Sequence, residues 1–272
     1  MGNYAYQLEP KKVGVLDKLN PNICNAGLLH GYLGGFIYTN PETVIDQKFV
    51  SKLCKEVQIR TGRCSYPHPL GHILLVNNGG DFTGAINACK KLETSRWISD
   101  CLSGVFMEDI QKTMLEEHGL AKRPTLDNAY ILTLEARCMS YNENQIAKIC
   151  WKEMAGPYTH HYGFNPKTIF EKCSQSKNDE YRDECYFSAA SNMSITYTKP
   201  GQLEPLQDLP PLCSNYISVP DLYRKCLEYI INVNIHSSKI LIGRIKEFCA
   251  HETKKYQNTT CDDILAEKLK YS

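Results

Sequence analysis

The 272-residue chain has no excess of charge of either sign, no long apolar run and no C-x-x-C motif. Its 31 basic and 30 acidic side chains are spread along the chain, so no basic stripe is available to neutralise phosphates, and we expect no nucleic-acid partner. No apolar run approaches the roughly 18 residues that cross a bilayer, so we expect no transmembrane segment. The missing C-x-x-C argues against a zinc ribbon and against thioredoxin chemistry.

Cysteine, by contrast, is abundant, with 13 residues in the chain. Twelve of them form pairs with similar internal spacing: Cys54/Cys64, Cys89/Cys101, Cys138/Cys150, Cys173/Cys185, Cys213/Cys226 and Cys249/Cys261. Such regular pairing predicts disulfides and an extracellular, periplasmic or other oxidising compartment. Reduced buried cysteines and metal-thiolate sites are the alternatives. The first ten residues lack an apolar h-region, so we expect no signal peptide within this chain.

Cys24 is left over by this pairing. Three roles remain open for it: a free thiol, a bridge to another chain, or the partner of a cysteine in a different connectivity. A nucleophilic pair of Cys24 with His30 is a further hypothesis, since an imidazole lowers the pKa of a neighbouring thiol.

The spacing within the pairs also predicts the fold. Two cysteines twelve residues apart on one straight helix would be about 18 Å from each other. A disulfide needs its Cα atoms within about 7 Å, so the chain must double back inside each pair. Apolar residues at three- and four-residue steps predict one long helix from Ser95 to His118, ended by Gly119, and another that begins near Pro220. We therefore predict a mainly α fold of disulfide-stapled helical hairpins.

Successive pairs begin 35, 49, 35, 40 and 36 residues apart, a range typical of two-helix repeats. An irregular α/α repeat array is the prediction, and an irregular helical domain with scattered disulfides is the alternative. Loops at 121–127 and 199–211 suggest three regions. These are a helical region with His/Gly motifs at 1–120, middle hairpins at 121–211 and C-terminal hairpins at 212–272, unless all three form one continuous domain.

Candidate chemistry lies in the N-terminal third. His68 and His72 are four residues apart, so on a helix both point to the same side and can reach one ion. Pro69 is compatible with a helix if it occupies the first turn. One hypothesis is that His30, His68 and His72 bind a divalent transition metal, Zn, Cu or Fe, with Glu108 or Asp109 as an oxygen ligand. A lone His-x-x-x-His pair without the Glu of His-Glu-x-x-His is a weak metal signal, which favours the structural interpretation: the histidines cap helices and hydrogen-bond to nearby backbone.

The segment from Cys24 to about Met107 resembles a group of uncharacterised secreted bacterial helical proteins with paired cysteines. The shared pattern is a Cys…His-Gly segment followed by a Cys…His-x-x-Gly-His segment. The matching residues of this chain are Cys24, His30, Gly31, Cys64, His68, Gly71 and His72. The resemblance implies a secreted cysteine-paired helical fold and carries no known activity.

Two classes of function follow. In the first, the helical hairpins form a binding or scaffolding module for a protein, peptide or glycan partner. In the second, the chain is a metalloprotein or metal-dependent enzyme with a site at His30, His68 and His72. No motif specifies an enzymatic reaction, so the sequence leaves open whether the protein is an enzyme. The frequency of helical binding modules favours the first class.

Overall fold

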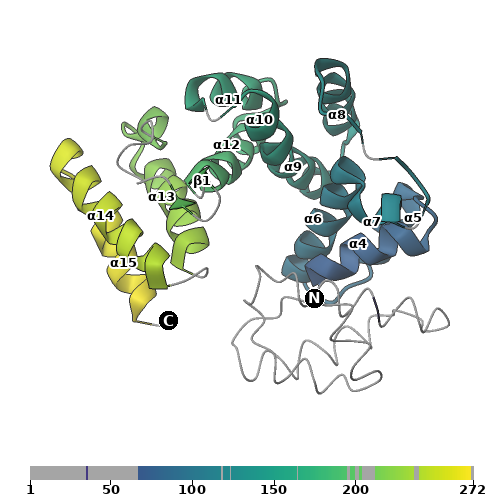
Figure 1. Cartoon of the computed structure of the whole chain (residues 1–272), viewed down its shortest axis with the longest axis horizontal. Coiled ribbons are helices and arrows are strands. Elements are labelled where there is room, and N and C mark those ends of the chain that lie inside the picture. Colours follow the sequence, from purple (N-terminus) through teal and green to yellow (C-terminus); the bar gives the residue numbers. More distant parts are fainter. Residues whose placement is uncertain are drawn as a thin grey trace. The chain divides into compact units, whose positions relative to one another are not determined.

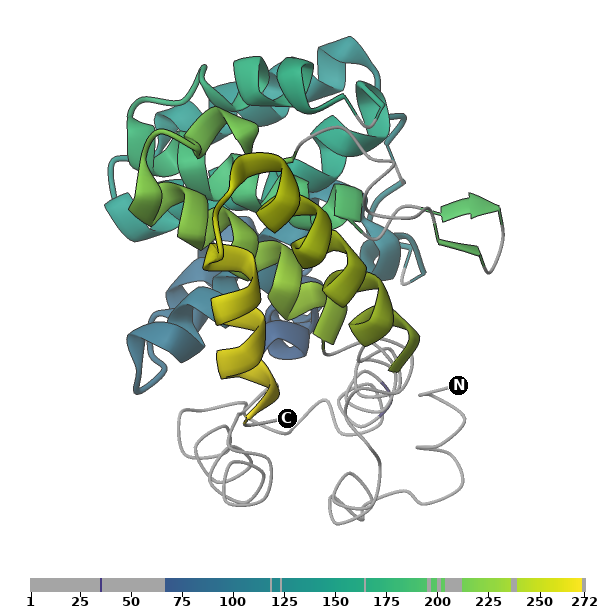
Figure 2. The same ribbon diagram turned by 90° about the vertical axis from the view of Figure 1, so that its left-hand side faces the viewer.

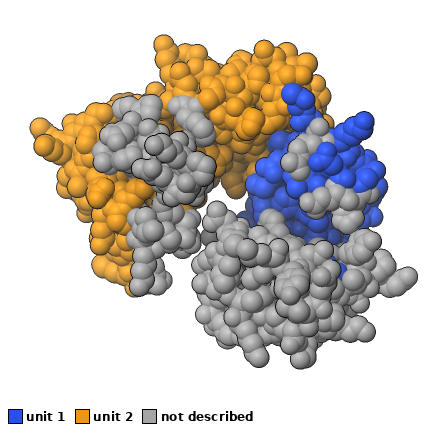
Figure 3. Space-filling view, in the orientation of Figure 1, with its two compact units in different colours: residues 1–125 blue, residues 126–272 orange. Residues whose placement is uncertain are grey.

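The computed structural model describes Gly35 and residues 67–117, 119–122, 124–163, 165–194, 197–199, 202–203, 212–235 and 239–270. Most of these residues are helical, which confirms the predicted mainly α class (Figure 1). The contacts divide the chain into two compact units, Met1–Thr125 and Leu126–Ser272, coloured separately in Figure 3. Cys24, His30 and the Cys54/Cys64 pair lie outside the described residues, and both the three-region division and the repeat array stay predictions.

Unit 1 contains four described helices: α4 (Pro67–Asn77), α5 (Phe82–Cys89), α6 (Ser95–Gln111) and α7 (Thr113–Glu117). A polar side chain before each of two of these helices accepts a hydrogen bond from one free N–H group of the first turn. Asp81 Oδ1 accepts a hydrogen bond from Thr83 N, and Thr94 Oγ1 accepts one from Trp97 N. Helix α6 packs along α4 and also contacts α5 and α7.

The prediction of a single helix from Ser95 to His118 is wrong, because α6 ends at Gln111 and α7 begins at Thr113, with Lys112 between them. Lys112 has φ 51°, in the left-handed region that ends a right-handed helix. The N–H of Leu115, in the next helix, donates to Glu108 Oε1 at 2.8 Å instead of to a backbone carbonyl of α6. Gly119, with φ 70°, follows α7, as the sequence predicts for the end of this region.

Unit 2 contains eight α-helices and one 3₁₀ helix among its described residues: α8 (Asn128–Ser140), α9 (Asn144–Glu153), α10 (Ala155–His161), α11 (Pro166–Cys173), α12 (Asp179–Ser194), η3 (Ser214–Tyr216), α13 (Pro220–Ile235), α14 (Lys239–Tyr256) and α15 (Thr260–Leu269). Helix α12 contacts α9, α10, α11 and α13, so it is surrounded by protein and buries residues on several sides. No helix within the described ranges is long and apolar enough to cross a membrane.

A two-stranded antiparallel pair interrupts unit 2 where the sequence predicts only a proline-rich loop. Strand β1 (Tyr197–Lys199) pairs with β2 (Gln202–Leu203), with Tyr197 opposite Leu203. Figure 2 shows the pair as two short arrows to one side of the helices. Strands this short carry no period-two pattern that would distinguish them from a loop.

Five of the predicted cysteine pairs form disulfides: Cys89–Cys101, Cys138–Cys150, Cys173–Cys185, Cys213–Cys226 and Cys249–Cys261. Their Cα atoms are 5.1 to 5.9 Å apart. Four of these bonds join consecutive helices, as the hairpin prediction requires. The exception is Cys213–Cys226, which ties the segment before η3 to α13.

Candidate functional site

The candidate site of unit 1 is built on a very close crossing of α4 and α6. A Cβ atom on Gly71 would lie 2.0 Å from Cys101 O, and one on Gly104 would lie 2.0 Å from His68 O. Because no side chain larger than hydrogen fits at either position, the two backbones approach more closely than other residues allow. The crossing brings the face of α4 that carries the histidines against α6, which carries the carboxylates.

The beginning of α4 explains how the histidines are presented. The helix begins at Pro67, so His68 and Pro69 both lie in its first turn, as the sequence predicts. Proline is accepted there because the first N–H groups of a helix have no partner within it. His72 is one turn further along, on the same side as His68.

His68, His72 and Glu108 form a chain of close polar contacts. His72 Nδ1 lies 3.1 Å from Glu108 Oε2, and His72 Nε2 lies 3.3 Å from His68 Nε2. His72 is 6% exposed and Glu108 is 1% exposed, whereas His68 is half-buried. A carboxylate accepts a hydrogen bond only from a protonated nitrogen, so this contact assigns the Nδ1–H tautomer to neutral His72. The Nε2 lone pair of His72 is then directed toward His68.

The second oxygen of Glu108 fixes the end of α6. Glu108 Oε1 accepts the N–H of Leu115 at 2.8 Å, and the backbone carbonyl of Glu108 accepts the N–H of Lys112 at 2.6 Å. Lys112 Nζ in turn donates to Asp109 Oδ1 at 3.2 Å. Burial lowers the pKa of Lys112, and the nearby charge of Glu108 partly offsets that shift. A lysine therefore stands next to the two buried carboxylates.

The structure brings together three of the predicted site residues: His68, His72 and Glu108. Glu108 contacts Nδ1 of His72, whereas His68 contacts Nε2 on the other side of the same ring. Asp109 contacts Lys112. Within the described residues, no three His, Cys, Asp or Glu side chains are grouped to hold a metal ion. Because His30 lies outside the described residues, the full ligand set of His30, His68, His72 and Glu108 is not tested and stays a hypothesis.

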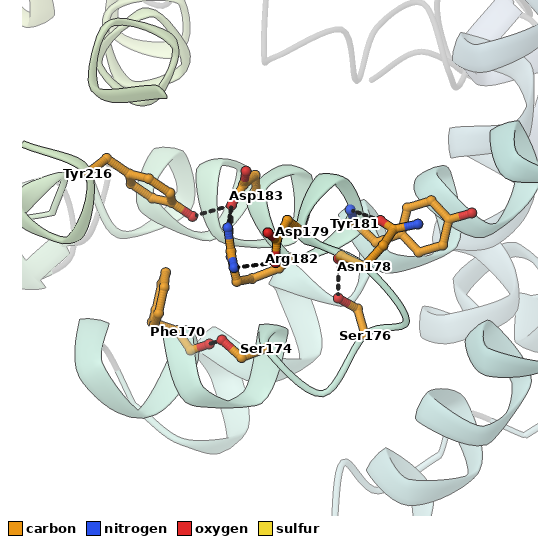
Figure 4. A network of polar contacts seen from close by, with 9 residues as sticks. All are labelled: Phe170, Ser174, Ser176, Asn178, Asp179, Tyr181, Arg182, Asp183 and Tyr216. Atoms are coloured by element: carbon orange, nitrogen blue, oxygen red, sulfur yellow. Dashed lines mark hydrogen bonds and ion pairs between the residues drawn. The ribbon is translucent and has the colours of Figure 1, made fainter. Parts of the chain in front are cut away.

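A second polar cluster lies in unit 2 between α11, α12 and η3 (Figure 4). Arg182 contacts Asp179 at 2.6 Å and Asp183 at 2.8 Å, and its guanidinium lies 5.7 Å from the ring centre of Phe170. Tyr216 OH donates to Asp183 Oδ1 at 2.8 Å. Burial, followed by the charge of Asp183, raises the pKa of Tyr216 well above its ordinary value. Arg182, Asp183 and Tyr216 are thus paired with one another, and these contacts fasten η3 to α12.

Tyrosine–carboxylate pairs also join other helices of unit 2. Tyr229 OH donates to Glu184, which also accepts from Lys225 at 2.8 Å. Burial would raise the pKa of Glu184, but these two hydrogen bonds outweigh it and lower the pKa. Tyr223 OH donates to Glu252 at 2.8 Å, and there burial prevails and raises the pKa of Glu252. No local sequence pattern indicates these pairs, because 29 to 45 residues separate the partners.

Comparisons with protein-family models, curated proteins and solved structures find no match for this chain.

Proposed function

We propose that this chain is a metal-binding helical protein of an oxidising compartment and that His68 and His72 bind the ion through Nε2. The 3.3 Å separation of the two Nε2 atoms carries the proposal. Zinc binds histidine nitrogen at about 2.0–2.1 Å in tetrahedral geometry, which places two such nitrogens about 3.3 Å apart. The two imidazoles are thus spaced as two ligands of one ion.

The contact of His72 with Glu108 supports the same proposal. A histidine that binds a metal commonly donates its other ring N–H to a carboxylate, which fixes the tautomer and orients the ring. Glu108 lies in that position, 3.1 Å from Nδ1 of His72. Glu108 is then an outer partner of the site, whereas the sequence predicts it as a direct ligand.

The donor atoms indicate which ions the site would take. The described cysteines are all in disulfides, so they offer no thiolate. Two imidazoles suit Zn²⁺ and Cu²⁺ and are poor ligands for Mg²⁺ or Ca²⁺. His30 is the predicted third ligand, and water would complete the coordination. An ion with a bound water is able to activate that water or to polarise a carbonyl, which is the chemistry of a metal-dependent hydrolase.

Metal uptake by purified, metal-stripped protein tests the proposal. Isothermal titration with Zn²⁺ and Cu²⁺ is expected to give one tight site per chain in the wild type. His68→Ala and His72→Ala are each expected to weaken binding by at least about 10-fold, because each removes one ligand. His251→Ala is the matched control, since His251 is exposed on α14 of the other unit. A plain hydrogen bond between the two imidazoles predicts no tight site, and equal affinity in all variants would exclude the proposed ligands.

Helix α8 favours the binding or scaffolding function as a second candidate. Its exposed residues Ala129, Leu132, Ala136 and Met139 follow one another at helical spacing and form an apolar stripe. Leu132 is 60% exposed and Met139 is 38% exposed. Exposed apolar stripes of this kind serve as contact surfaces for protein or peptide partners.

Cross-linking in the fluid or compartment from which the protein is isolated tests this second function. A protein partner is expected to cross-link to the wild type and not to a Leu132→Asp/Met139→Asp variant. Val219→Asp, at an apolar residue that is 43% exposed outside α8, is the control and is expected to keep the partner. A partner retained by the double variant would exclude the α8 stripe as its binding surface.

A further inference from the structure

We propose that Glu108 is a positioning residue that links metal occupancy of His68 and His72 to the order of the α6–α7 junction. The inference rests on the metal-binding function proposed above and adds a consequence of binding. One carboxylate makes both contacts: Oε2 lies 3.1 Å from His72 Nδ1, and Oε1 accepts the N–H of Leu115 at 2.8 Å. The site and the junction therefore share a single side chain.

The surroundings of Glu108 make this link direct. Only 1% of the residue is exposed, so water does not replace either partner freely. His72 is 36 residues away in sequence and Leu115 is seven residues away. A shift of the carboxylate toward or away from one partner changes its distance to the other. The two hydrogen bonds are therefore coupled through the χ angles of one buried side chain.

The junction is a segment whose order such a contact can change. Helix α7 is five residues long, too short to be stable by its own hydrogen bonds. Lys112, which precedes it, has φ 51°, a conformation that costs a non-glycine residue about 1 kcal/mol. The backbone carbonyl of Glu108 accepts the N–H of Lys112, and its carboxylate accepts the N–H of Leu115 beyond the break.

The chemistry of the imidazole gives the direction of the effect. An ion on Nε2 withdraws electron density from the ring, so Nδ1–H becomes a stronger donor to Glu108. The stronger bond restricts the carboxylate to the orientation in which its other oxygen accepts from Leu115. Metal binding then protects the Leu115 amide, and by linkage an ordered junction favours metal binding.

Amide exchange of Leu115 in the full chain, measured with and without Zn²⁺ by NMR or mass spectrometry, tests the link. In the wild type Zn²⁺ is expected to slow this exchange by about 5-fold or more. In Glu108→Gln the slowing is expected to be lost, and Zn²⁺ affinity is expected to fall by about 10- to 100-fold. Glu116→Gln is the control, since it removes an exposed carboxylate from α7 itself, and it is expected to behave as the wild type.

Two further measurements separate positioning from a structural role. Long-range proton–nitrogen spectra of the metal-free wild type are expected to show His72 as the Nδ1–H tautomer, and this preference is expected to disappear in Glu108→Gln. If that variant does not fold, His72→Gln replaces it: its Leu115 exchange is expected to be insensitive to Zn²⁺. Zinc that binds the wild type without slowing Leu115 exchange overturns this inference alone. A wild type that binds no zinc overturns the proposed function as well.

Discussion

Gly71 and Gly104 face each other where α4 crosses α6, and a Cβ atom on Gly104 would lie 3.2 Å from the Cα of Gly71. The same Cβ would lie 2.0 Å from the carbonyl oxygen of His68. The position of the histidine-bearing turn of α4 therefore depends on the absence of a side chain on α6. Fold and candidate site are determined at the same contact.

Gly104→Ala is expected to lower the free energy of unfolding by about 3 kcal/mol, because a methyl group there must displace backbone atoms. It is also expected to weaken metal binding, since it moves His68. Gly243→Ala is the control: a methyl group on Gly243, in α14, would meet no atom within 4 Å, so alanine is expected to stabilise the helix by about 0.5–1 kcal/mol. Urea unfolding of both variants checks the pair, and equal effects would show that the crossing tolerates a side chain.

Much of the helical framework could be predicted because its signals are local. The twelve-residue cysteine spacing predicts a reversal of the chain, and the disulfides from Cys89 to Cys101 and from Cys173 to Cys185 close such reversals. The prolines around His68 indicate a first helical turn, and α4 begins at Pro67. Each of these inferences uses residues that are close together in the chain.

The site could be predicted only in part because its decisive contacts are not local. The spacing of His68 and His72 indicates that they share a side, which the structure confirms. The contact of His72 with Glu108 joins residues 36 apart, and no pattern in one sequence indicates it. No sequence pattern indicates the break at Lys112 either, because lysine has no preference for the left-handed conformation and the contact of Glu108 with Leu115 stabilises the break.

Removal of one disulfide is expected to destabilise the chain measurably. Cys173→Ser/Cys185→Ser opens a loop of about a dozen residues, which in the chain-entropy description costs about 3 kcal/mol. Cys24→Ser is the comparison and is expected to leave stability unchanged if Cys24 is the unpaired cysteine. Urea unfolding under non-reducing conditions measures both. Thiol labelling of the denatured, unreduced wild type is expected to modify one cysteine, and three or more labelled thiols would contradict the six predicted pairs.

Glu252 is expected to make unit 2 less stable as pH rises. Burial raises the pKa of Glu252 in the folded chain, so the folded state holds this proton at pH values where the unfolded state has lost it. The contribution of Glu252 to the free energy of unfolding is complete below its pKa in the unfolded state. It is lost as pH rises through its higher pKa in the folded state.

Glu252→Gln is therefore expected to be more stable than the wild type at pH 7, because the amide stays neutral and still accepts from Tyr223. The difference is expected to shrink toward pH 4, where Glu252 itself is protonated. Glu184 is the internal contrast: its pKa is lowered, so its contribution is lost as pH falls, and Glu184→Gln is expected to destabilise at pH 7. Thermal unfolding across this pH range measures both variants, and a pH-independent gain for Glu252→Gln would show that its effect is not electrostatic.

Lys112 and Gln257 allow the same backbone conformation to be tested in two electrostatic settings. Both have φ 51°, which favours glycine over a residue with a Cβ. Gln257 is exposed in the turn between α14 and α15, so Gln257→Gly is expected to raise the free energy of unfolding by about 1 kcal/mol. Lys112→Gly removes the same unfavourable backbone conformation. It also removes a cation that stands beside the buried Glu108 and contacts the buried Asp109 at 3.2 Å.

We expect the loss of that cation to cancel or exceed the backbone gain, since an uncompensated buried carboxylate is costly. Urea unfolding of the two glycine variants measures the difference directly. If Lys112→Gly stabilises the protein as much as Gln257→Gly does, the lysine contributes nothing to holding the two carboxylates. If Lys112→Gly destabilises the protein, the charge of Lys112 beside Glu108 contributes more to stability than its backbone conformation costs.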